Sequence, residues 1–255
     1  MFKILLARLQ QKYRTIPFPK KPAPGLPERF MGRPEFNGNA CAPDCNMCVE
    51  VCPTDAIGAG GKRILDLGRC LFCGECQKVC LTRAIHFSKE YQLATRKREH
   101  LVLDSASFQI AEALEKKTLR LFGRSLKLRQ VSAGGCNACE ADTNVLGTVG
   151  WDLGRFGIQF VASPRHADGI LVTGPVPENM RVALLKTYEA VSDPKIVIAV
   201  GACAISGGPY IGHDEVHNGV TPLLPVDLFI PGCPPHPLTI LDGLLRLIGV
   251  LDQGR

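Results

Sequence analysis

The second half of the chain alternates short apolar runs with segments of helical periodicity. Apolar residues recur at helical spacing over 182–188 and 238–248. Between these segments lie five nearly continuous apolar runs, the pattern of parallel strands covered on both faces: 126–131, 158–162, 169–173, 196–200 and 226–230. The pattern therefore predicts an α/β domain over residues 125–255.

Residues 89–124 are predicted to be a connector between two structured regions. Phe108, Ala111 and Leu114 recur near helical spacing, which predicts a helix over 105–121. We find no residue pattern with catalytic or binding chemistry in this segment.

Residues 40–88 contain an internal repeat of 28 residues. The segment CVEVCPTDAI begins at Cys48, and the similar segment CQKVCLTRAI begins at Cys76. Each half contains closely spaced cysteines, a short helix and the start of a strand, and glycines mark the turns between them. A duplicated half-module is the simplest interpretation of this pattern.

The spacing of the twelve cysteines in this 255-residue chain indicates metal sites and not a disulfide scaffold. Disulfide scaffolds are short and spread their cysteines along the chain, whereas metal sites cluster them at intervals of two or three residues. No secretory signal is recognisable, and no apolar run reaches the ~18 residues that a membrane helix needs. We therefore expect a cytoplasmic chain. Its cysteines fall into tight groups and two single positions: Cys41, Cys45, Cys48, Cys52; Cys70, Cys73, Cys76, Cys80; Cys136, Cys139; Cys203; and Cys233.

The net charge of +6 is confined to the beginning of the chain. Residues 1–39 hold eight Lys or Arg and two Asp or Glu, and the rest of the chain holds 22 of each. This distribution argues against a nucleic-acid-binding surface. We interpret residues 1–39 as a basic, proline-rich arm that begins with an amphipathic stretch. The arm is expected either to be solvated and flexible or to lie on a partner subunit or an anionic membrane.

The cysteine runs of residues 40–88 resemble those of bacterial two-cluster ferredoxins. In that family three cysteines of each run bind one [4Fe–4S] cluster and the fourth binds the other cluster. The resemblance implies one cluster on Cys41, Cys45, Cys48 and Cys80, and a second on Cys70, Cys73, Cys76 and Cys52.

Two features depart from the ferredoxin pattern. The first run reads C-x3-C-x2-C, one residue longer than usual, and Leu81 replaces an expected proline. A tetrahedral zinc site is the alternative, but such sites usually pair two separated knuckles. The first run also imitates radical S-adenosylmethionine enzymes, although its fourth cysteine and the repeat argue against them.

The remaining four cysteines come just after predicted strands. Cys136 and Cys139 follow the first strand, Cys203 follows the fourth, and Cys233 follows the fifth. Because the carboxyl ends of parallel strands line one crevice, we expect the four thiols to converge there. Neighbouring glycines let the backbone approach a bulky cluster. The alternative is that these cysteines are buried and inert.

Four segments of this region carry a second resemblance: GGCNACE, SPRHADGILVTGPV, VGACAISGG and PGCPP. Over about residues 125–250 the chain is similar to the small subunit shared by energy-converting [NiFe] hydrogenases, including formate hydrogenlyase, and respiratory complex I. The resemblance implies a third [4Fe–4S] cluster on Cys136, Cys139, Cys203 and Cys233. It also implies that a catalytic large subunit lies next to this cluster, together with other hydrophilic and membrane subunits.

The spacing of the first two of these cysteines favours one branch of the family. Complex I usually has two adjacent cysteines, whereas Cys136-x2-Cys139 is similar to the hydrogenase branch. The resemblance also implies a peripheral position on the cytoplasmic side of the inner membrane, held by partner subunits.

Several other motifs are weaker. His213 and His217 are predicted to lie in a surface loop, and Arg165 and His166 either raise a cluster potential or pack against a partner. Glu140, next to Cys139, is a candidate proton relay. The chain has no G-x-G-x-x-G after a strand and no Walker A motif, so we expect no nucleotide site.

The combined expectation is an α+β ferredoxin-like two-cluster domain followed by an α/β flavodoxin-like parallel-sheet domain. We expect an electron-transfer subunit that relays electrons through three [4Fe–4S] clusters to or from a [NiFe] large subunit. The alternative is the equivalent subunit of a complex I-like quinone oxidoreductase without nickel. A stand-alone polyferredoxin or redox sensor is a third, more distant interpretation.

Overall fold

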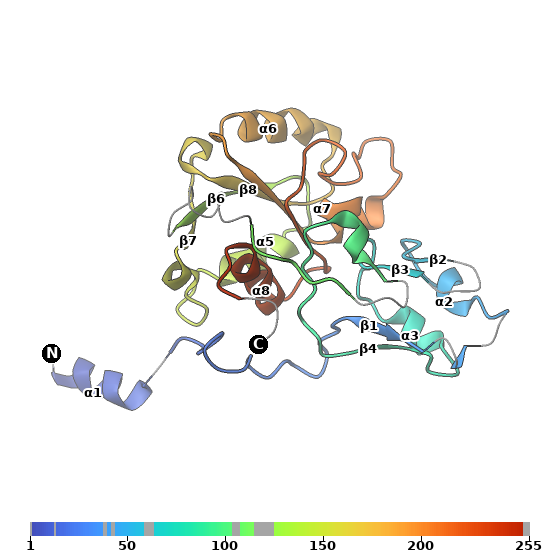
Figure 1. Cartoon of the computed structure of the whole chain (residues 1–255), viewed down its shortest axis with the longest axis horizontal. Helices are drawn as coiled ribbons and strands as arrows, with labels where there is room; N and C mark the ends of the chain where they lie inside the picture. Colours follow the sequence, from blue (N-terminus) through green and yellow to red (C-terminus); the bar gives the residue numbers. More distant parts are fainter. Residues whose placement is uncertain are drawn as a thin grey trace.

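The computed structural model contains a larger unit built on a parallel sheet and a smaller unit that holds the repeat (Figure 1). In Figure 1 the larger unit occupies the upper left and the smaller unit lies at the right. The structure describes residues 2–12, 14–37, 40–41, 44–58, 64–103, 108–114 and 125–251.

Five parallel strands form the central sheet in the order β10-β9-β8-β6-β7. This order is that of flavodoxin-like sheets, and all five predicted strands are confirmed. Every residue of β8, β9 and β10 is buried, which explains their continuous apolar runs. The strands are β6 (Leu126–Ser132), β7 (Ile158–Phe160), β8 (Gly169–Thr173), β9 (Ile196–Val200) and β10 (Leu228–Ile230).

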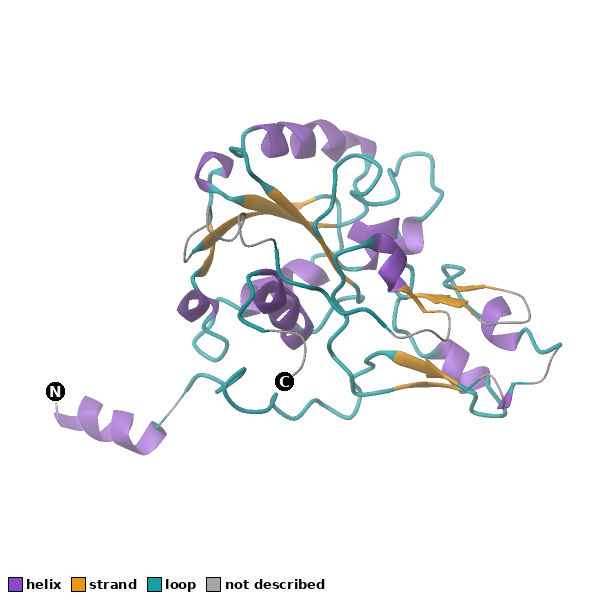
Figure 2. Ribbon diagram, in the orientation of Figure 1, coloured by secondary structure: helices purple, strands orange, loops and turns teal. Residues whose placement is uncertain are grey.

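Helices cover both faces of this sheet (Figure 2). One face carries α6 (Glu178–Glu189), and the other carries α5 (Ala138–Val145) and α8 (Pro237–Leu247). The helices predicted over 182–188 and 238–248 are therefore confirmed as α6 and α8. Within the described residues, no helix has both the length and the apolar character required to cross a membrane. The remaining short elements are η3 (Leu153–Phe156), η4 (Pro164–His166), α7 (Ala202–Ser206) and η5 (Gly208–Tyr210).

The repeat region is built from two small antiparallel sheets and two short helices. The helix α2 (Met47–Glu50) contains Cys48, and α3 (Glu75–Val79) contains Cys76, so the two helices share the 28-residue offset of the repeat. The sheets are β1–β4 and β2–β3–β5. Their strands are β1 (Pro34–Phe36), β2 (Ile57–Gly58), β3 (Ile64–Asp66), β4 (Ile85–Phe87) and β5 (Val102–Leu103), the last preceded by η2 (Arg98–Leu101).

The predicted limits of the repeat region, 40–88, are too narrow. The strand β1 precedes residue 40 and pairs with β4, while β5 follows residue 88 and pairs with β3. Both outer strands come from segments without cysteines, so the cysteine pattern did not indicate them.

Polar and apolar contacts fix the repeat region to the larger unit. The buried Ser206 hydroxyl donates to the Gly68 carbonyl at 2.8 Å. Thr95 and Phe229 exchange backbone hydrogen bonds of 3.0 and 2.8 Å, which extend the sheet beyond β10. A continuous group of buried apolar residues includes Cys76 of the smaller unit and Ile205 of the larger one.

The expectation of a free arm over residues 1–39 is wrong for most of its length. Phe18 is buried, the Ile16 amide donates to the Gly150 carbonyl at 2.9 Å, and Arg155 donates to the carbonyls of Ile16 and Phe18, each at 2.8 Å. Only the helix α1 (Phe2–Gln11) projects from the body (Figure 1). The apolar residues among the prolines thus pack against the chain's own surface.

The helix predicted over 105–121 is absent from residues 108–114, the part of it that the structure describes. Ala111 and Leu114 are buried there, and their amides donate to the carbonyls of Ala94 at 2.7 Å and Leu247 at 2.9 Å. The apolar spacing therefore reflects anchoring of an irregular segment to the core. The other predicted positions lie outside the described residues.

Candidate metal centres

The structure brings four cysteines together at the carboxyl edge of the parallel sheet. A single cavity is lined by Cys136, Cys139, Cys203 and Cys233. Cys136 lies between β6 and α5, and Cys139 lies in the first turn of α5. Cys203 lies in α7 after β9, and Cys233 follows β10. Parallel strands point their carboxyl ends to one edge, so residues far apart in the sequence meet there.

Two glycines are required next to this cavity. A Cβ atom on Gly201 would lie 2.5 Å from Cys139 Sγ, and one on Gly208 would lie 2.8 Å from Cys203 Sγ. Both positions also have positive φ angles, +91° and +56°, which L side chains rarely adopt. The backbone therefore approaches the thiols more closely than any other residue would allow.

Two thiols of this group, those of Cys139 and Cys203, are held in a poorly solvated environment. Burial raises the pKa of Cys203 to about 11 and raises that of Cys139 further, and neighbouring thiols add to both shifts. A protonated thiol is a weak metal ligand, since the thiolate is the coordinating form. A cationic iron centre would supply the charge that makes the thiolates stable here.

Glu140 lies beside this group and is almost fully buried. Its carboxylate accepts hydrogen bonds from Ser132 and Thr173, each at 2.6 Å, at the ends of β6 and β8. Burial opposes ionisation of Glu140, but these two hydrogen bonds outweigh it and lower the pKa. The sequence singled out Glu140 but missed Ser132 and Thr173, because only the sheet brings these strand ends together.

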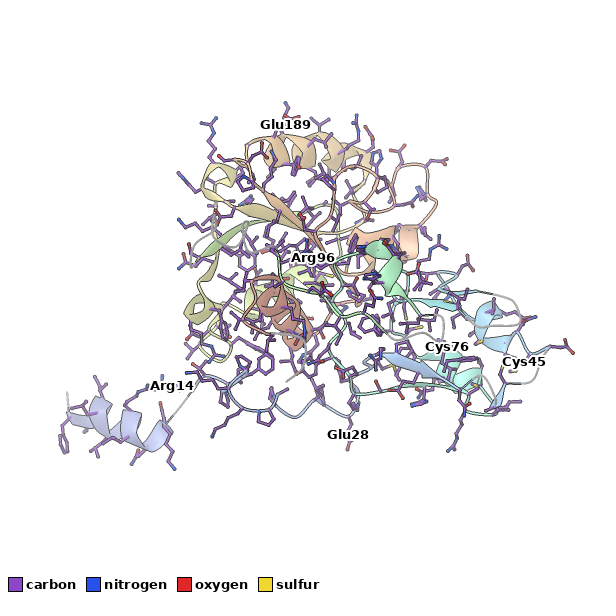
Figure 3. The ribbon with its side chains drawn as sticks, in the orientation of Figure 1. Arg14, Glu28, Cys45, Cys76, Arg96 and Glu189 are labelled. Atoms are coloured by element: carbon purple, nitrogen blue, oxygen red, sulfur yellow. The ribbon has the colours of Figure 1, made fainter. Side chains whose placement is uncertain are left out.

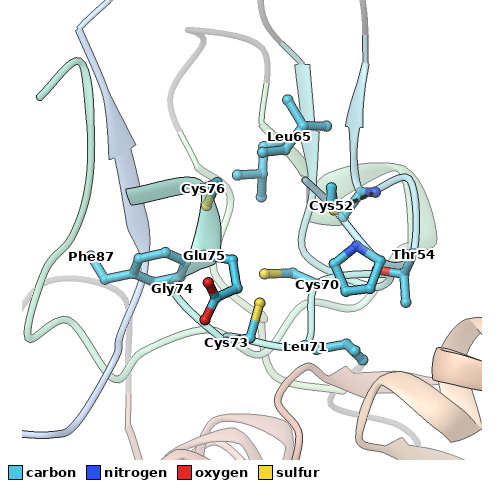
Figure 4. Close-up of a pocket in the computed structure, with 13 residues that line it drawn as sticks. Cys52, Thr54, Leu65, Cys70, Leu71, Cys73, Gly74, Glu75, Cys76 and Phe87 are labelled. Carbon is cyan, nitrogen blue, oxygen red and sulfur yellow. Dashed lines mark hydrogen bonds between the residues drawn. The ribbon is translucent and has the colours of Figure 1, made fainter. Parts of the chain in front are cut away.

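A second cavity is lined by four cysteines of the repeat region (Figure 4). Cys70, Cys73 and Cys76 come from the second run, and Cys52 comes from the first. Burial raises the pKa of Cys70 to about 12 and that of Cys76 to about 11. Cys52 of the first run therefore lines the same cavity as three cysteines of the second run.

Backbone amides donate to cysteine sulfurs at equivalent positions of the two repeats. The Ala56 amide donates to Cys52 Sγ at 3.2 Å, and the Ala84 amide donates to Cys80 Sγ at 3.1 Å. Such hydrogen bonds stabilise thiolates and influence the potential of an iron–sulfur cluster. The two repeats therefore give equivalent cysteines, Cys52 and Cys80, the same hydrogen bond from the backbone.

The remaining predicted group contains Cys41, Cys45, Cys48 and Cys80. Cys48 is buried in α2 and lies close enough to Cys76 to raise its pKa. Residues 42 and 43, between the first two cysteines, lie outside the described part of the chain. Figure 3 shows Cys45 near the outer end of the smaller unit, with Cys76 closer to the body. Among the described side chains, those of the two cysteine-lined cavities included, no three His, Cys, Asp or Glu residues have the spacing of a site for a single metal ion.

A third cavity, of about 380 Å³, lies between the two units. Cys73 of the second group and Cys233 of the sheet group both line it, together with His236 and Thr239. The Thr239 hydroxyl is buried and has no hydrogen-bond partner. Sequence reasoning missed this cavity because its walls come from separate segments of the chain, and Cys73 and Cys233 are more than a hundred residues apart.

The weaker predicted positions lie at the surface of the molecule. His217 Nε2 lies 2.5 Å from a Glu178 carboxylate oxygen on the surface, and His213 is exposed in the same loop, as predicted. Arg165 and His166 lie exposed in η4 after the edge strand β7.

The sheet domain matches a known protein family. The family model described as NADH ubiquinone oxidoreductase, 20 Kd subunit, matches residues 136–247. Formate hydrogenlyase subunit 7 of Escherichia coli (strain K12) is 42% identical over 143 residues, which cover 55% of each protein. The chain therefore spans about half the length of this relative.

Two further relatives and one solved structure are similar. The probable membrane-bound hydrogenase subunit mbhJ of Pyrococcus furiosus is 42% identical over 55% of this chain and 86% of its own length. An NADH-quinone oxidoreductase subunit of Phocaeicola vulgatus is 44% identical over 49% of this chain and 64% of its own length. A chain of the membrane-bound sulfane sulfur reductase, an archaeal respiratory membrane complex, is 33% identical over 56% of this chain and 78% of its own, with a TM-score of 0.46.

These matches include the four cysteines at the edge of the parallel sheet, because all four lie within the region that the family model covers. The chain also accounts for most of the archaeal hydrogenase subunit at 42% identity. It therefore belongs to the family of the NADH ubiquinone oxidoreductase 20 Kd subunit, whose members are subunits of oxidoreductase complexes.

Proposed function

We propose that this chain is an electron-transfer subunit that holds three [4Fe–4S] clusters. The observation that carries the proposal is the arrangement of the cysteines. One cavity is lined by the four cysteines of the sheet, and another is lined by Cys52 with Cys70, Cys73 and Cys76. Cys41, Cys45, Cys48 and Cys80 would hold the remaining cluster.

The residues around both cavities fit cubane clusters. Gly201 and Gly208 leave the space of a Cβ atom beside the sulfurs, and backbone amides donate to Cys52, Cys70 and Cys80. When bound, each cluster accepts and donates one electron at a time. The chain supplies the thiolates, excludes water from the buried sulfurs and sets the local charge.

The positions of the cysteines suggest the order in which electrons pass. Cys48 of the first group lies near Cys76 of the second, and Cys73 of the second lines the same cavity as Cys233 of the third. The second cluster would therefore lie between the other two. Electrons would pass from the outer end of the repeat region to the sheet domain, or in the reverse direction.

The third site would be completed by a partner subunit. Cys136 and Cys233 remain exposed at this site, although the neighbouring thiols are partly buried. A catalytic large subunit covering this edge would protect the cluster and exchange electrons with it. We propose a [NiFe] large subunit, within a complex on the cytoplasmic side of the membrane that contains further hydrophilic and membrane subunits.

The alternative partner is a complex I-like large subunit with a quinone site and no nickel. The relatives include both hydrogenase subunits and a quinone oxidoreductase subunit at similar identity. The spacing Cys136-x2-Cys139 favours the hydrogenase branch. However, this spacing serves the cluster and not the nickel, so the partner decides between the two.

The deciding experiment is anaerobic purification of the native complex, followed by assays of iron, sulfide, nickel and hydrogen-dependent dye reduction. We expect about twelve irons and twelve sulfides from this chain, four of each per cubane. Cys139→Ala should abolish dye reduction and remove the third cluster, while the spectra of the other two clusters remain.

Different outcomes would overturn different parts of the proposal. Stoichiometric zinc with little iron would exclude the cluster assignment. A nickel-free complex that is inert to hydrogen would exclude the hydrogenase partner and leave the quinone alternative, with all twelve ligand assignments intact.

A further inference from the structure

The helix α1 exposes an apolar stripe that nothing in the described part of the chain covers. We define the α1 stripe as Phe2, Leu5, Leu6 and Leu9, whose exposed fractions are 75%, 60%, 42% and 74%. With about 100° of rotation per residue, the four side chains fall within an arc of about 100° on the helix surface. No residue of α1 is buried. Large apolar side chains grouped in this way usually mark a binding surface.

Positive charges border this stripe, and the neighbouring sequence holds no negative charge. Lys3 and Arg8 lie on opposite sides of the stripe, and Lys12 and Arg14 follow the helix. The first acidic residue of the chain is Glu28. The cations on both flanks of the stripe match an apolar layer that is bordered by negative charges.

We propose that α1 lies in the headgroup layer of a bilayer that contains anionic phospholipids, and anchors this chain to it directly. The apolar stripe would enter the boundary between headgroups and acyl chains, while Lys3 and Arg8 extend their charged ends to the phosphates. A short helix with an apolar face about 100° wide and only basic charges has the composition of an interfacial helix. This anchor is independent of the electron-transfer proposal.

The attachment of α1 to the body gives the anchor an orientation. Just after the helix, the Thr15 hydroxyl donates to the Val149 carbonyl at 2.9 Å, and the Ile16 amide donates to the Gly150 carbonyl. Val149 is itself 65% exposed at this corner. In Figure 1, α1 and the repeat region lie at opposite ends of the molecule. The anchor would therefore hold the sheet domain near the membrane and the repeat region away from it.

Vesicle flotation of the full chain, with its clusters reconstituted under anaerobic conditions, tests the proposal. The vesicles are phosphatidylcholine alone or phosphatidylcholine mixed with phosphatidylglycerol. We expect binding to the mixed vesicles that weakens as salt is added. Lys3→Gln and Arg8→Gln should each lower the partition coefficient about fivefold, the factor that corresponds to ~1 kcal/mol per cation near the surface.

Matched variants in α1 and α6 distinguish binding through α1 from general effects of surface charge and exposed apolar residues. Leu5→Ser with Leu9→Ser should lower binding by about a hundredfold or more, because two leucines would no longer be buried in the membrane. Lys186→Gln and Val182→Ser, which change an exposed cation and an exposed apolar residue of α6, should leave binding unchanged. Cluster absorption should be the same in all variants, since α1 packs against no part of the core.

Three results would overturn the proposal. The first is absence of binding to the mixed vesicles. The second is equal loss of binding in the α6 variants, which would show a non-specific charge effect. The third is vesicle binding unaffected by the α1 variants while the same variants release the chain from the solubilised complex, which would identify a protein groove as the site that receives α1.

Discussion

Gly201 lies against a sulfur of the third proposed cluster site, since a Cβ atom on it would be 2.5 Å from Cys139 Sγ. Its φ of +91° is unfavourable for side chains, and Cys139 Sγ occupies the space next to its Cα. Gly212 shares the positive φ, at +77°, but has no atom within 4 Å of the position of a Cβ. A comparison of substitutions at these two glycines therefore distinguishes the effect of backbone strain from the effect of crowding at the sulfur.

Gly201→Ala should remove the third cluster, whereas Gly212→Ala should leave it in place. Both variants place a side chain at a positive φ, but only the first forces Cys139 Sγ away from its position. Iron analysis should show a loss of about four irons per chain for Gly201→Ala and none for Gly212→Ala. Equal losses in the two variants would show that strain alone explains the effect.

At the scale of elements, the packing of α2 against α3 brings the end of the first cysteine run next to the second run. The last cysteine of the first run leaves α2 and reaches the cavity of the second run. Hydrogen bonds from Ala56 to Cys52 and from Ala84 to Cys80 give the last cysteine of each run an equivalent local environment. In the proposed assignment, each cluster therefore depends on a cysteine from the other half of the repeat.

Cys52→Ser should damage the cluster of Cys70, Cys73 and Cys76, and Cys80→Ser should damage the cluster of Cys41, Cys45 and Cys48. Resolved electron paramagnetic resonance spectra of the reduced chain would identify which signal is lost in each variant. Loss of the cluster bound by the sequence neighbours would contradict the crossed assignment.

The helix α8 depends on a buried ion pair. Arg246 Nε donates to an Asp242 carboxylate oxygen at 2.8 Å, and both side chains are almost completely buried. Burial raises the pKa of Asp242, and the hydrogen bond from Arg246 opposes this shift. The pair is therefore sensitive to removal of either partner.

Asp242→Ala should destabilise the chain by about 3–5 kcal/mol, because it leaves the Arg246 guanidinium buried without a counter-charge. Thermal unfolding followed by circular dichroism measures the effect. Glu178→Ala, which breaks the surface pairs with Arg181 and His217, is the control and should change the melting temperature far less. A comparable decrease in the control would argue against burial as the cause.

At the scale of the whole molecule, the joint between the two units sets the position of the second proposed cluster relative to the third. Arg98 donates two hydrogen bonds to the Asp66 carboxylate, at 2.8 and 2.6 Å, and a Cβ atom on Gly68 would contact both Arg98 and Ile205. Arg69 approaches the same carboxylate only to 3.9 Å. The two arginines therefore differ in how firmly they hold β3 to η2, next to the point where Ser206 of the larger unit contacts Gly68.

Arg98→Ala should weaken the packing of η2 on β3 by about 1.5–3 kcal/mol, the range for hydrogen bonds to charged groups, and thereby loosen the adjoining contact of Gly68 with the larger unit. Limited proteolysis should then cleave between the repeat region and the sheet domain faster than in the unchanged chain, and electron transfer between them should slow. Arg69→Ala should resemble the unchanged chain. Equal sensitivity of both variants would mean that net charge, and not the two hydrogen bonds, holds the joint.

Much of this molecule was determined by local sequence. The five apolar runs predicted the strands of the sheet, and helical spacing predicted α6 and α8, because burial on one or two faces leaves a regular pattern along the chain. The cysteine spacing and the 28-residue repeat likewise indicated the candidate ligands, since closely spaced thiols come from one short segment.

Only the tertiary structure decided how separate segments meet. The segment over 108–114 has helical spacing but is irregular, because its backbone amides find partners in Ala94 and Leu247. Residues 14–37 pack against the body although their composition suggested a free arm, and β1 and β5 join the repeat region from outside it. The partners of Glu140 and the cavity shared by Cys73 and Cys233 also come from distant segments. Such contacts depend on chain topology, which brings together residues that are far apart in the sequence. The local sequence around one residue of such a pair does not indicate the other.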